Sequence, residues 1–419
     1  MDIWQVKGGN KLMGSCDVQG SKNASLPILA ASIISPMECR LYNLPKLRDV
    51  DAAMKILRYL GCKAEQQGNE GYIDSRSLSS SYIPPELMEE MRSSVIFMGA
   101  LLARCGECKL SPPGGCQLGK RPIDLHLKAL EELGADIEED GGEIFCRSKK
   151  LKGGLISFPF PSVGATENLL LASCRAEGKT IIHNAAREPE ISALADFLRA
   201  AGADIKGDGS SCIEVSGFRA NKSVDCRIIP DRIVASSFAC ACAACGGDIE
   251  IKKSNPSQFS TLLYFLNCAG CDIINGTRAL RIKSQGRLKA IGPVSTAPYP
   301  GFPTDAQPLL MAALLKAEGE SVIEENIFQN RYRQVPELLH LGADISLYGK
   351  IARIRGVEAL SGSVLQAGDL RGGASMLIAA LSAEGESVIL DSGHIRRGYE
   401  DFDLSLKSLG AELEVQFTE

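Results

Sequence analysis

The sequence predicts an α/β protein built from six repeated helix-and-sheet units, three in each of two domains. Two recurring sequence markers predict the repeat: a short apolar segment that contains Gly, and a second Gly-containing segment in front of it. The length of 419 residues predicts the division, because one ordinary hydrophobic core does not grow to that size. The elements of each unit follow from the two markers.

The first marker occurs six times, as LGCKA, LGADI, AGADI, AGCDI, LGADI and LGAEL. Its glycines are Gly61, Gly134, Gly202, Gly270, Gly342 and Gly410. Successive copies therefore lie 73, 68, 68, 72 and 68 residues apart. Apolar residues at helical spacing precede each Gly, and a strand pattern follows it. We expect each Gly to end a helix in the left-handed conformation, which glycine adopts without strain.

The second marker precedes the first, as AEGKTIIHN from Ala176, AEGESVIEE from Ala317 and AEGESVILD from Ala383. Weaker copies are CGECKLS, CGGDIEI and SPMECRLYN. Together the markers predict, in each unit, a helix, a Gly turn, a strand, a second helix, a second Gly turn and two or more strands.

Composition and charge exclude several classes of protein. The net charge of -5 and pI near 5.7 argue against a protein that coats nucleic acid. The first residues, MDIWQV, do not resemble a signal peptide. No apolar run reaches the roughly 18 residues of a membrane-spanning helix. We expect a cytoplasmic protein with no membrane insertion.

The fifteen cysteines are spread along the chain, unlike a disulfide framework. A zinc site is one interpretation, since CxxC pairs supply thiolate ligands. The cysteines concerned are Cys240, Cys242, Cys245, Cys268 and Cys271. The first three lie in SSFACACAACGG, which predicts a buried helix where Cys packs as a small residue. Cys271 fills a repeat position that is Ala in other copies. The sequence thus favours packed thiols over a metal site.

Five stretches interrupt the repeat, and loops on a rigid scaffold commonly carry the functional site. They are QGSKNASLPIL, PPGGCQLGKRPIDLH, PSVGATENLLL, PYPGFPTDAQPLL, and GDLRGGASM with HIRRGYED. Several open a helix with small residues, and free N–H groups there suit a phosphate. Each loop alone also reads as an ordinary cap or turn. Cations that would bind a small anion if folding brings them together are Lys22, Arg92, Arg121, Arg371 and Arg397.

Taken in order, with AAREPEI, PDRI and NRY, these stretches closely resemble the UDP-N-acetylglucosamine 1-carboxyvinyltransferase family of the EPSP synthase superfamily. The resemblance covers essentially the whole chain. It implies a two-domain inside-out α/β barrel with the helices inside. Residues 1–21 and 230–419 would form a catalytic domain that carries Asp305, Arg371 and Arg397. Residues 22–229 would form the second domain, with the Cys116 loop, and the active site would lie between the two.

The family's reaction, implied here by resemblance, transfers the enolpyruvyl group of phosphoenolpyruvate to the 3′-hydroxyl of UDP-N-acetylglucosamine. Phosphate leaves by addition and elimination through a tetrahedral intermediate, in the first committed step of peptidoglycan synthesis. The resemblance implies a monomer that acts on these two small molecules, without a cofactor or metal and without nucleic acid.

The matched positions supply the expected site residues. The implied catalytic residues are Cys116, Asp305, Lys22 and Arg397, with Cys116 as the loop thiol that fosfomycin alkylates in this family and Asp305 as the candidate base. Nearby cations favour the thiolate form of Cys116. The implied substrate-binding residues are Lys22, Asn23, Arg92, Arg121, Pro122, Ile123, Asp124, Leu125, Ser162, Val163, Gly164, Asp305, Ile327, Asp369, Arg371 and Arg397.

Two alternatives remain open at this stage. The related shikimate-pathway enolpyruvyl transferase shares the fold and phosphoenolpyruvate. It lacks the Gly-Gly-Cys loop and usually carries a Gly-Asn-Ala-Gly-Thr stretch, which this chain does not contain. A non-catalytic paralogue that binds the sugar nucleotide would be expected to lose Cys116, Asp305 or a cation, and none is lost. A phosphate-release assay with both substrates separates these alternatives.

Overall fold

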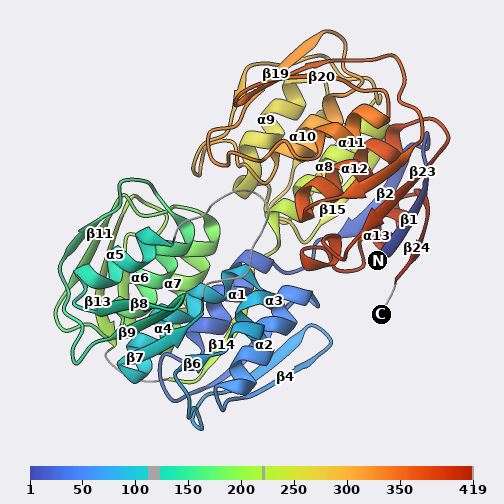
Figure 1. The fold of residues 1–419 in the computed structure, drawn as a ribbon. Coiled ribbons are helices and arrows are strands. Elements are labelled where there is room, and N and C mark those ends of the chain that lie inside the picture. Colours follow the sequence, from blue (N-terminus) through green and yellow to red (C-terminus); the bar gives the residue numbers. More distant parts are fainter. Residues whose placement is uncertain (112–122, 219–221, 418–419) are drawn as a thin grey trace. The chain divides into compact units, whose positions relative to one another are not determined.

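The computed structural model describes the chain except residues 112–122, 219–221 and 418–419, and the side chain of Arg92. The described residues form two compact units, unit 1 and unit 2, each of which contains three of the six sequence repeats (Figure 1). Unit 1 comprises those of Met1–Gln19 and Pro230–Glu419, and unit 2 comprises those between Gly20 and Ile229.

Unit 2 contains three four-stranded sheets, of strand order β14-β3-β5-β4, β6-β7-β9-β8 and β10-β11-β13-β12. Their strands are β3 (Glu38–Tyr42), β4 (Lys63–Gln67), β5 (Glu70–Asp74), β6 (Tyr82–Ile83), β7 (Glu107–Leu110), β8 (Asp136–Asp140), β9 (Glu143–Arg147), β10 (Leu155–Ser157), β11 (Thr180–His183), β12 (Ala203–Lys206), β13 (Cys212–Phe218) and β14 (Val224–Arg227).

Unit 1 contains three more four-stranded sheets, of order β2-β15-β17-β16, β18-β19-β21-β20 and β22-β23-β1-β24. Their strands are β1 (Asp2–Lys7), β2 (Leu12–Asp17), β15 (Gly247–Lys252), β16 (Asp272–Asn275), β17 (Ala279–Ser284), β18 (Val294–Ser295), β19 (Glu320–Glu324), β20 (Asp344–Tyr348), β21 (Ile351–Arg355), β22 (Val364–Ala367), β23 (Glu386–Asp391) and β24 (Glu412–Gln416).

The pairing pattern is the same in all six of these sheets. In the orders given above, the first two strands are parallel and the other neighbours are antiparallel. Distant segments complete three sheets: β14 pairs with β3, β2 pairs with β15, and β1 lies between β23 and β24. The structure thus confirms the sixfold repeat, and each of the six sheets contains strands of only one of the two compact units.

Helices connect the strands of each unit. Those of unit 2 are α1 (Lys22–Ala31), α2 (Arg48–Tyr59), α3 (Pro85–Glu90), α4 (Phe97–Cys105), α5 (Asp124–Glu132), α6 (Val163–Ser173), α7 (Pro189–Ala201) and the 3₁₀ turn η1 (Arg92–Ile96). Those of unit 1 are α8 (Arg232–Cys245), α9 (Ser260–Cys268), α10 (Gln307–Leu314), α11 (Val335–His340), α12 (Leu370–Ser382), α13 (Phe402–Ser408), η2 (Pro256–Phe259) and η3 (Ile395–Arg397). Among the described residues, no helix is long and apolar enough to cross a membrane.

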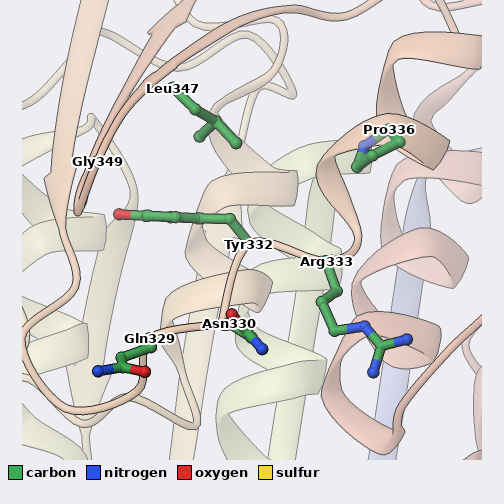
Figure 2. Close-up of a pocket in the computed structure, with 7 residues that line it drawn as sticks. All are labelled: Gln329, Asn330, Tyr332, Arg333, Pro336, Leu347 and Gly349. Carbon is green, nitrogen blue, oxygen red and sulfur yellow. The ribbon is translucent and has the colours of Figure 1, made fainter. Parts of the chain in front are cut away.

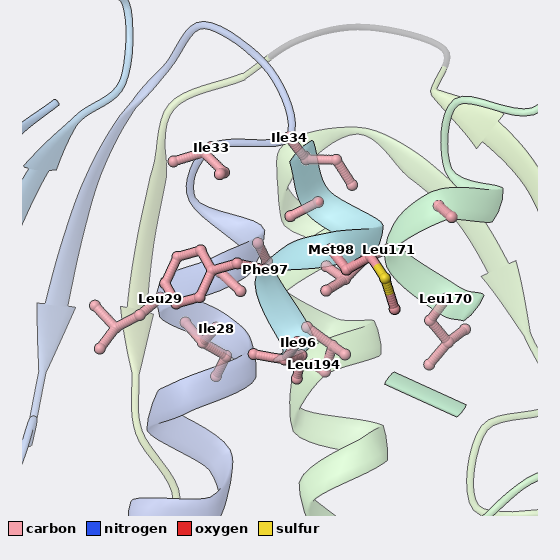
Figure 3. Close-up of a cluster of buried hydrophobic side chains, with 14 of the residues drawn as sticks. Ile28, Leu29, Ile33, Ile34, Ile96, Phe97, Met98, Leu170, Leu171 and Leu194 are labelled. Atoms are coloured by element: carbon pink, nitrogen blue, oxygen red, sulfur yellow. The ribbon is translucent and has the colours of Figure 1, made fainter. Parts of the chain in front are cut away.

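The most apolar helices lie inside each unit. In unit 1, α8, α10 and α12 pack on one another and are buried along nearly their whole length. In unit 2, α4 packs against α1 and α6, and Figure 3 shows side chains of these helices, including Ile28, Phe97 and Leu171, in one buried cluster. A helix that is apolar on all sides must be buried, so the sheets form the outer layer. This is the inside-out α/β arrangement that the family resemblance implied.

The six repeated glycines end helices as predicted. Their φ angles lie between +86° and +111°, in the left-handed region. Each Gly N–H donates to the carbonyl three residues earlier, as Gly134 does to Glu131. In five copies the next N–H donates to the carbonyl five residues earlier, as Ala135 does to Leu130 at 3.0 Å. These bonds form a Schellman-type helix end, which only glycine adopts cheaply.

The cysteine-rich stretch forms α8, as predicted. Cys240 and Cys242 are fully buried in it. Burial raises the pKa of Cys245 to about 12 and that of Cys271 to about 11, so both thiols stay protonated at neutral pH. Among the described residues, no three His, Cys, Asp or Glu side chains are grouped as metal ligands.

Candidate active site

Asp305 lies in the turn before α10, beside two buried arginines of unit 1. Its Oδ1 accepts a hydrogen bond from Nη2 of Arg331 at 2.9 Å and lies 3.5 Å from Nε of Arg371. The arginine side chains are 2% and 4% exposed, whereas that of Asp305 is 32% exposed. Two buried cations therefore hold the carboxylate in place and leave part of its surface accessible.

A second set of bonds links the turn of Asp305 to the segment of Ile327. Nε of Arg331 donates to the carbonyl of Thr304 at 3.0 Å, and the Thr304 hydroxyl donates to Oε2 of Glu325 at 3.0 Å. The other oxygen of Glu325 accepts the N–H of Ile327 at 2.8 Å. Asp305 and Ile327, both predicted to bind substrate, are thus held in one hydrogen-bonded network.

Asp369 and Arg371 stand at the start of α12. Asp369 caps the helix, since its Oδ1 accepts the N–H groups of Arg371 at 3.0 Å and Gly372 at 3.1 Å. This cap holds the first turn of α12 in the position from which the side chain of Arg371 reaches Asp305.

The guanidinium of Arg371 also lies over an aromatic ring, 5.6 Å from the centroid of Tyr399. Burial acts to lower the pKa of Arg371, but the adjacent Tyr399 side chain and the carboxylates of Asp305 and Asp231 outweigh it and raise that pKa above its ordinary value. Arg397 lies on η3, two residues before Tyr399. The segment that carries Arg397 therefore lies next to Tyr399 and packs against α12, the helix of Arg371.

In unit 2, Lys22 and Asn23 are the first two residues of α1. Nζ of Lys22 pairs with Oδ2 of Asp49, on α2, at 3.2 Å, and the two side chains are 13% and 2% exposed. Ser21 caps the helix by accepting the N–H of Ala24 at 3.3 Å. The ion pair holds the lysine beside the open end of the helix.

Two further helix ends carry predicted binding residues of unit 2. Ser162 caps α6 by accepting the N–H of Ala165 at 3.4 Å, and Val163 and Gly164 are the first residues of that helix. Among the described residues, the N–H groups of Val163 and Gly164 donate to no acceptor. Such N–H groups at a helix N-terminus suit a phosphate.

The start of α5 supplies the second of these ends. Ile123 is its N-cap residue, and Asp124 and Leu125 are its first two residues. The helix packs against α6, and the ring of His126 lies against Gly164. The structure therefore brings the segment Ile123–Leu125 next to the segment Ser162–Gly164.

The comparisons with known proteins show the family to which the chain belongs. Residues 6–406 match the family described as EPSP synthase (3-phosphoshikimate 1-carboxyvinyltransferase). The chain belongs to the EPSP synthase family. It is 44% identical over 413 residues to UDP-N-acetylglucosamine 1-carboxyvinyltransferase 2 of Caldanaerobacter subterraneus, with 99% of each chain covered. It is 45% identical over 414 residues to the UDP-N-acetylglucosamine 1-carboxyvinyltransferase of Nitratidesulfovibrio vulgaris, again with 99% of each covered. The resemblance inferred from the sequence is confirmed.

Solved structures show the same fold at lower identity. The enolpyruvyl transferase NikO from Streptomyces tendae aligns with a TM-score of 0.89 at 24% identity, over 100% of this chain and 99% of that one. The EPSP synthase of Acinetobacter baumannii aligns with a TM-score of 0.77 at 21% identity, over 100% of each chain. The predicted fold class is therefore confirmed as that of EPSP synthase family members.

Cys116, Arg121 and Pro122 lie outside the described residues, as does the side chain of Arg92, whose backbone belongs to η1. Their roles remain predictions from the resemblance.

The site also contains residues that the sequence reasoning did not select. Arg331 lies in the motif NRY and Tyr399 in the motif HIRRGYED, so the family motifs could have indicated both as site residues. Glu325 lies at the end of the AEGESVIEE marker, where it reads as part of the repeat. Asp49 has no comparable signal, because it is 27 residues from Lys22 in the chain.

A separate hollow of about 530 Å³ lies near this site in unit 1 and is drawn in Figure 2. It is lined by Gln329, Asn330, Tyr332, Arg333, Pro336, Leu347 and Gly349. None of these is a predicted site residue, and the intervening Arg331 binds Asp305 instead. The hollow is therefore not part of the network described above.

Proposed function

We propose that this chain catalyses transfer of the enolpyruvyl group of phosphoenolpyruvate to the 3′-hydroxyl of UDP-N-acetylglucosamine, with release of phosphate. The observation that carries this proposal is the similarity to UDP-N-acetylglucosamine 1-carboxyvinyltransferases at about 44% identity over 99% of both chains. The reaction is the first committed step of peptidoglycan synthesis. Shikimate 3-phosphate is the competing acceptor, since the family also contains EPSP synthase.

Asp305 is proposed as the base that accepts the proton of the 3′-hydroxyl. Its carboxylate is partly exposed, and it is held by Arg331 and Arg371. A positioned carboxylate of this kind accelerates attack by a hydroxyl group. An anionic substrate that binds the two arginines would neutralise them and make the carboxylate a stronger base.

Arg371 is proposed to bind an anionic group of phosphoenolpyruvate. Its Nη1 is buried and makes no hydrogen bond of good geometry among the described residues, although the hydroxyl of Tyr399 lies beside the guanidinium group. A buried, unpaired guanidinium nitrogen is costly, and a substrate carboxylate or phosphate would satisfy it. Lys22, Arg92, Arg121 and Arg397 are proposed as the remaining cations for phosphoenolpyruvate.

The helix ends of unit 2 are proposed to bind the sugar nucleotide. The segments Arg121–Leu125 and Ser162–Gly164, with Ile327 of unit 1, would contact the uridine diphosphate, and Asn23 would contact the sugar. Cys116 is proposed to deliver the proton that C3 of the enolpyruvyl group needs. A thiolate cannot donate that proton, so substrate binding must first restore the thiol.

The groups of both units are proposed to act on the same pair of substrates, with unit 1 as the catalytic domain. We further propose a cytoplasmic monomer that needs no cofactor. Exclusion of water from the bound substrates would protect the reactive intermediate from hydrolysis.

The test is a phosphate-release assay with phosphoenolpyruvate and one acceptor at a time. We expect inorganic phosphate with UDP-N-acetylglucosamine and none with shikimate 3-phosphate. Release with shikimate 3-phosphate alone would overturn the substrate assignment, and release with neither acceptor would favour a non-catalytic binding protein.

A further inference from the structure

One polar network in unit 2 joins three of the segments that carry predicted substrate-binding residues, namely η1, the start of α5 and α6. Asn168, on α6, is fully buried at its centre. It contacts the backbone of η1 and α4 and the ring of His126 on α5. Neither Asn168 nor His126 is among the residues that the family resemblance assigns to substrate.

The backbone around Asn168 decides which way its amide group points. The N–H of Gly99 can only donate, and it lies 2.7 Å from Oδ1. The carbonyl of Val95 can only accept, and it lies 3.1 Å from Nδ2. In the opposite orientation the amide N–H of Asn168 would face the N–H of Gly99, and its oxygen would face the carbonyl oxygen of Val95. Nδ2 is therefore the atom that faces Val95 and His126.

This orientation in turn decides the state of His126. Nδ2 of Asn168 lies 2.7 Å from Nδ1 of His126, so Nδ1 must accept a hydrogen bond and carries no proton. The imidazole is then neutral, with its proton on Nε2. Burial lowers the pKa of His126 to about 4, in agreement with a neutral ring at pH 7.

The ring of His126 also fills the space beside the first turn of α6. A Cβ atom on Gly164 would lie 2.9 Å from Cε1 and 3.2 Å from Nε2 of this ring. Only glycine therefore permits this close contact. The edge of the ring that contains Cε1 and Nε2 faces the N-terminus of α6, which Ser162 caps. The contact sets the spacing between the starts of α5 and α6.

We propose that Asn168 and His126 are positioning residues that fix η1, the start of α5 and the start of α6 relative to one another, with His126 held as the neutral Nε2–H tautomer beside Gly164. The proposal rests on the proposed function in one respect, namely that these three segments bind UDP-N-acetylglucosamine and phosphoenolpyruvate. Because Asn168 and His126 act through those segments, their loss should raise KM more than it lowers kcat. A 1 Å displacement of binding groups is enough for such an effect.

The tautomer is tested first, on the free protein, by nitrogen-15 NMR of the imidazole rings at pH 7. The chain has four histidines, so the His126→Gln variant assigns the signal. We expect a protonated Nε2 and a bare Nδ1 in the wild type. A proton on Nδ1, or a doubly protonated ring, would overturn the proposal whatever the activity of the enzyme.

Substitution then tests positioning. In Asn168→Asp the carboxylate keeps the acceptor for Gly99 but cannot donate, so the proton of His126 should move to Nδ1 and the KM for UDP-N-acetylglucosamine should rise about tenfold. His126→Gln leaves the bonds of Asn168 to Gly99 and Val95 in place and should also raise KM more than it lowers kcat. His183→Gln changes an exposed histidine of β11 in the same unit and is the control.

The outcomes separate this proposal from the proposed function. If the wild-type protein releases no phosphate with UDP-N-acetylglucosamine, the proposed function fails, while the NMR result still decides the tautomer. If the wild type is active and folded His126→Gln has the same KM as His183→Gln, the positioning role is wrong.

Discussion

The two units share one repeat but cap two of their three inner helices differently; α10 and α4 have no side-chain cap in either unit. In unit 1, α8 and α12 are capped by Asp231 and Asp369, and each carboxylate accepts two backbone N–H groups. In unit 2, α1 and α6 are capped by Ser21 and Ser162, and each hydroxyl accepts one. The pairing of the sheets around these helices is the same in both units.

The difference in caps changes what each helix end can bind. A capping aspartate accepts two N–H groups of the first turn and adds a negative charge, and that of Asp231 is among the groups that raise the pKa of Arg371. A serine uses one N–H group and adds no charge, so the remaining N–H groups can bind an anion. The fold thus provides comparable helix ends, and the cap residue changes how many backbone N–H groups are left for an anion.

The largest expected effect concerns the charge network of unit 1. Asp305→Asn keeps the size and the hydrogen-bonding ability of the side chain but removes the proton acceptor. We expect turnover to fall by about 10²–10⁴-fold, with binding of UDP-N-acetylglucosamine largely kept. Phosphate release and calorimetry measure the two quantities. The control is Asp344→Asn, an exposed aspartate of β20, and near-normal turnover in Asp305→Asn would move the base role to another residue.

The second prediction contrasts the buried thiols of unit 1 with the loop thiol Cys116. Burial raises the pKa of Cys245 to about 12, so this thiol should be inert, whereas Cys116 stands beside Lys120 and Arg121 in the sequence. We expect fosfomycin to form one adduct per chain, on Cys116, and faster with UDP-N-acetylglucosamine present.

Peptide mass spectrometry locates the adduct. Cys116→Asp keeps an acid on the loop and should resist the drug while retaining turnover. The exposed Cys105 is the internal control, and an adduct there in place of Cys116 would contradict the assignment.

The third prediction exchanges the cap type between the units. Ser162→Asp retains a good N-cap, so stability should change little, but the new carboxylate would repel the diphosphate of the sugar nucleotide. We expect KM for UDP-N-acetylglucosamine to rise at least about tenfold, roughly the 1.4 kcal/mol of one like-charge contact at a partly exposed site. Ser162→Ala is the matched variant, with a loss of about 1 kcal/mol of stability and a smaller rise in KM. Equal KM values for the two variants would argue against a phosphate at this helix end.

The smallest effect concerns a buried carboxyl group of unit 2. Burial, then the charges of Glu190 and Glu188, raise the pKa of Glu167 well above its ordinary value. Below the unfolded pKa both states hold the proton and nothing is lost. As the pH rises above that value, the unfolded chain releases its proton first, so the native state becomes less stable until the folded pKa is passed.

Glu167→Gln removes this penalty. We expect the variant to gain about 1 kcal/mol of stability relative to the wild type at pH 8 and less at pH 5. Denaturant unfolding at the two pH values measures the difference. A gain that is the same at both pH values would mean that ionisation of Glu167 is not the cause.

The sequence predicted those features of the fold that depend on neighbouring residues. The glycine of each repeat, such as Gly134, could be recognised because a helix end requires a left-handed residue at a fixed place in the pattern. The cysteines of α8 could be recognised as packed residues because small apolar residues surround them on every side. The helix start at Ser162 followed from small residues in front of an apolar run.

The partners of the site residues depended on the tertiary structure. Lys22 meets Asp49, and Asp305 meets Arg331, across 27 and 26 residues of chain. Such side-chain pairs leave no periodic pattern in one sequence, because they depend on how helices from different repeats pack.

By itself, then, the sequence determined the repeat, the helix ends and the family, since local backbone preferences and full-length similarity are properties of the chain. Only the tertiary structure decided that Arg331 holds Asp305 and that Asn168 sets the proton of His126. The physical reason is that a hydrogen bond or ion pair depends on atoms within about 3 Å of each other, and residues far apart in the chain reach that distance only through folding.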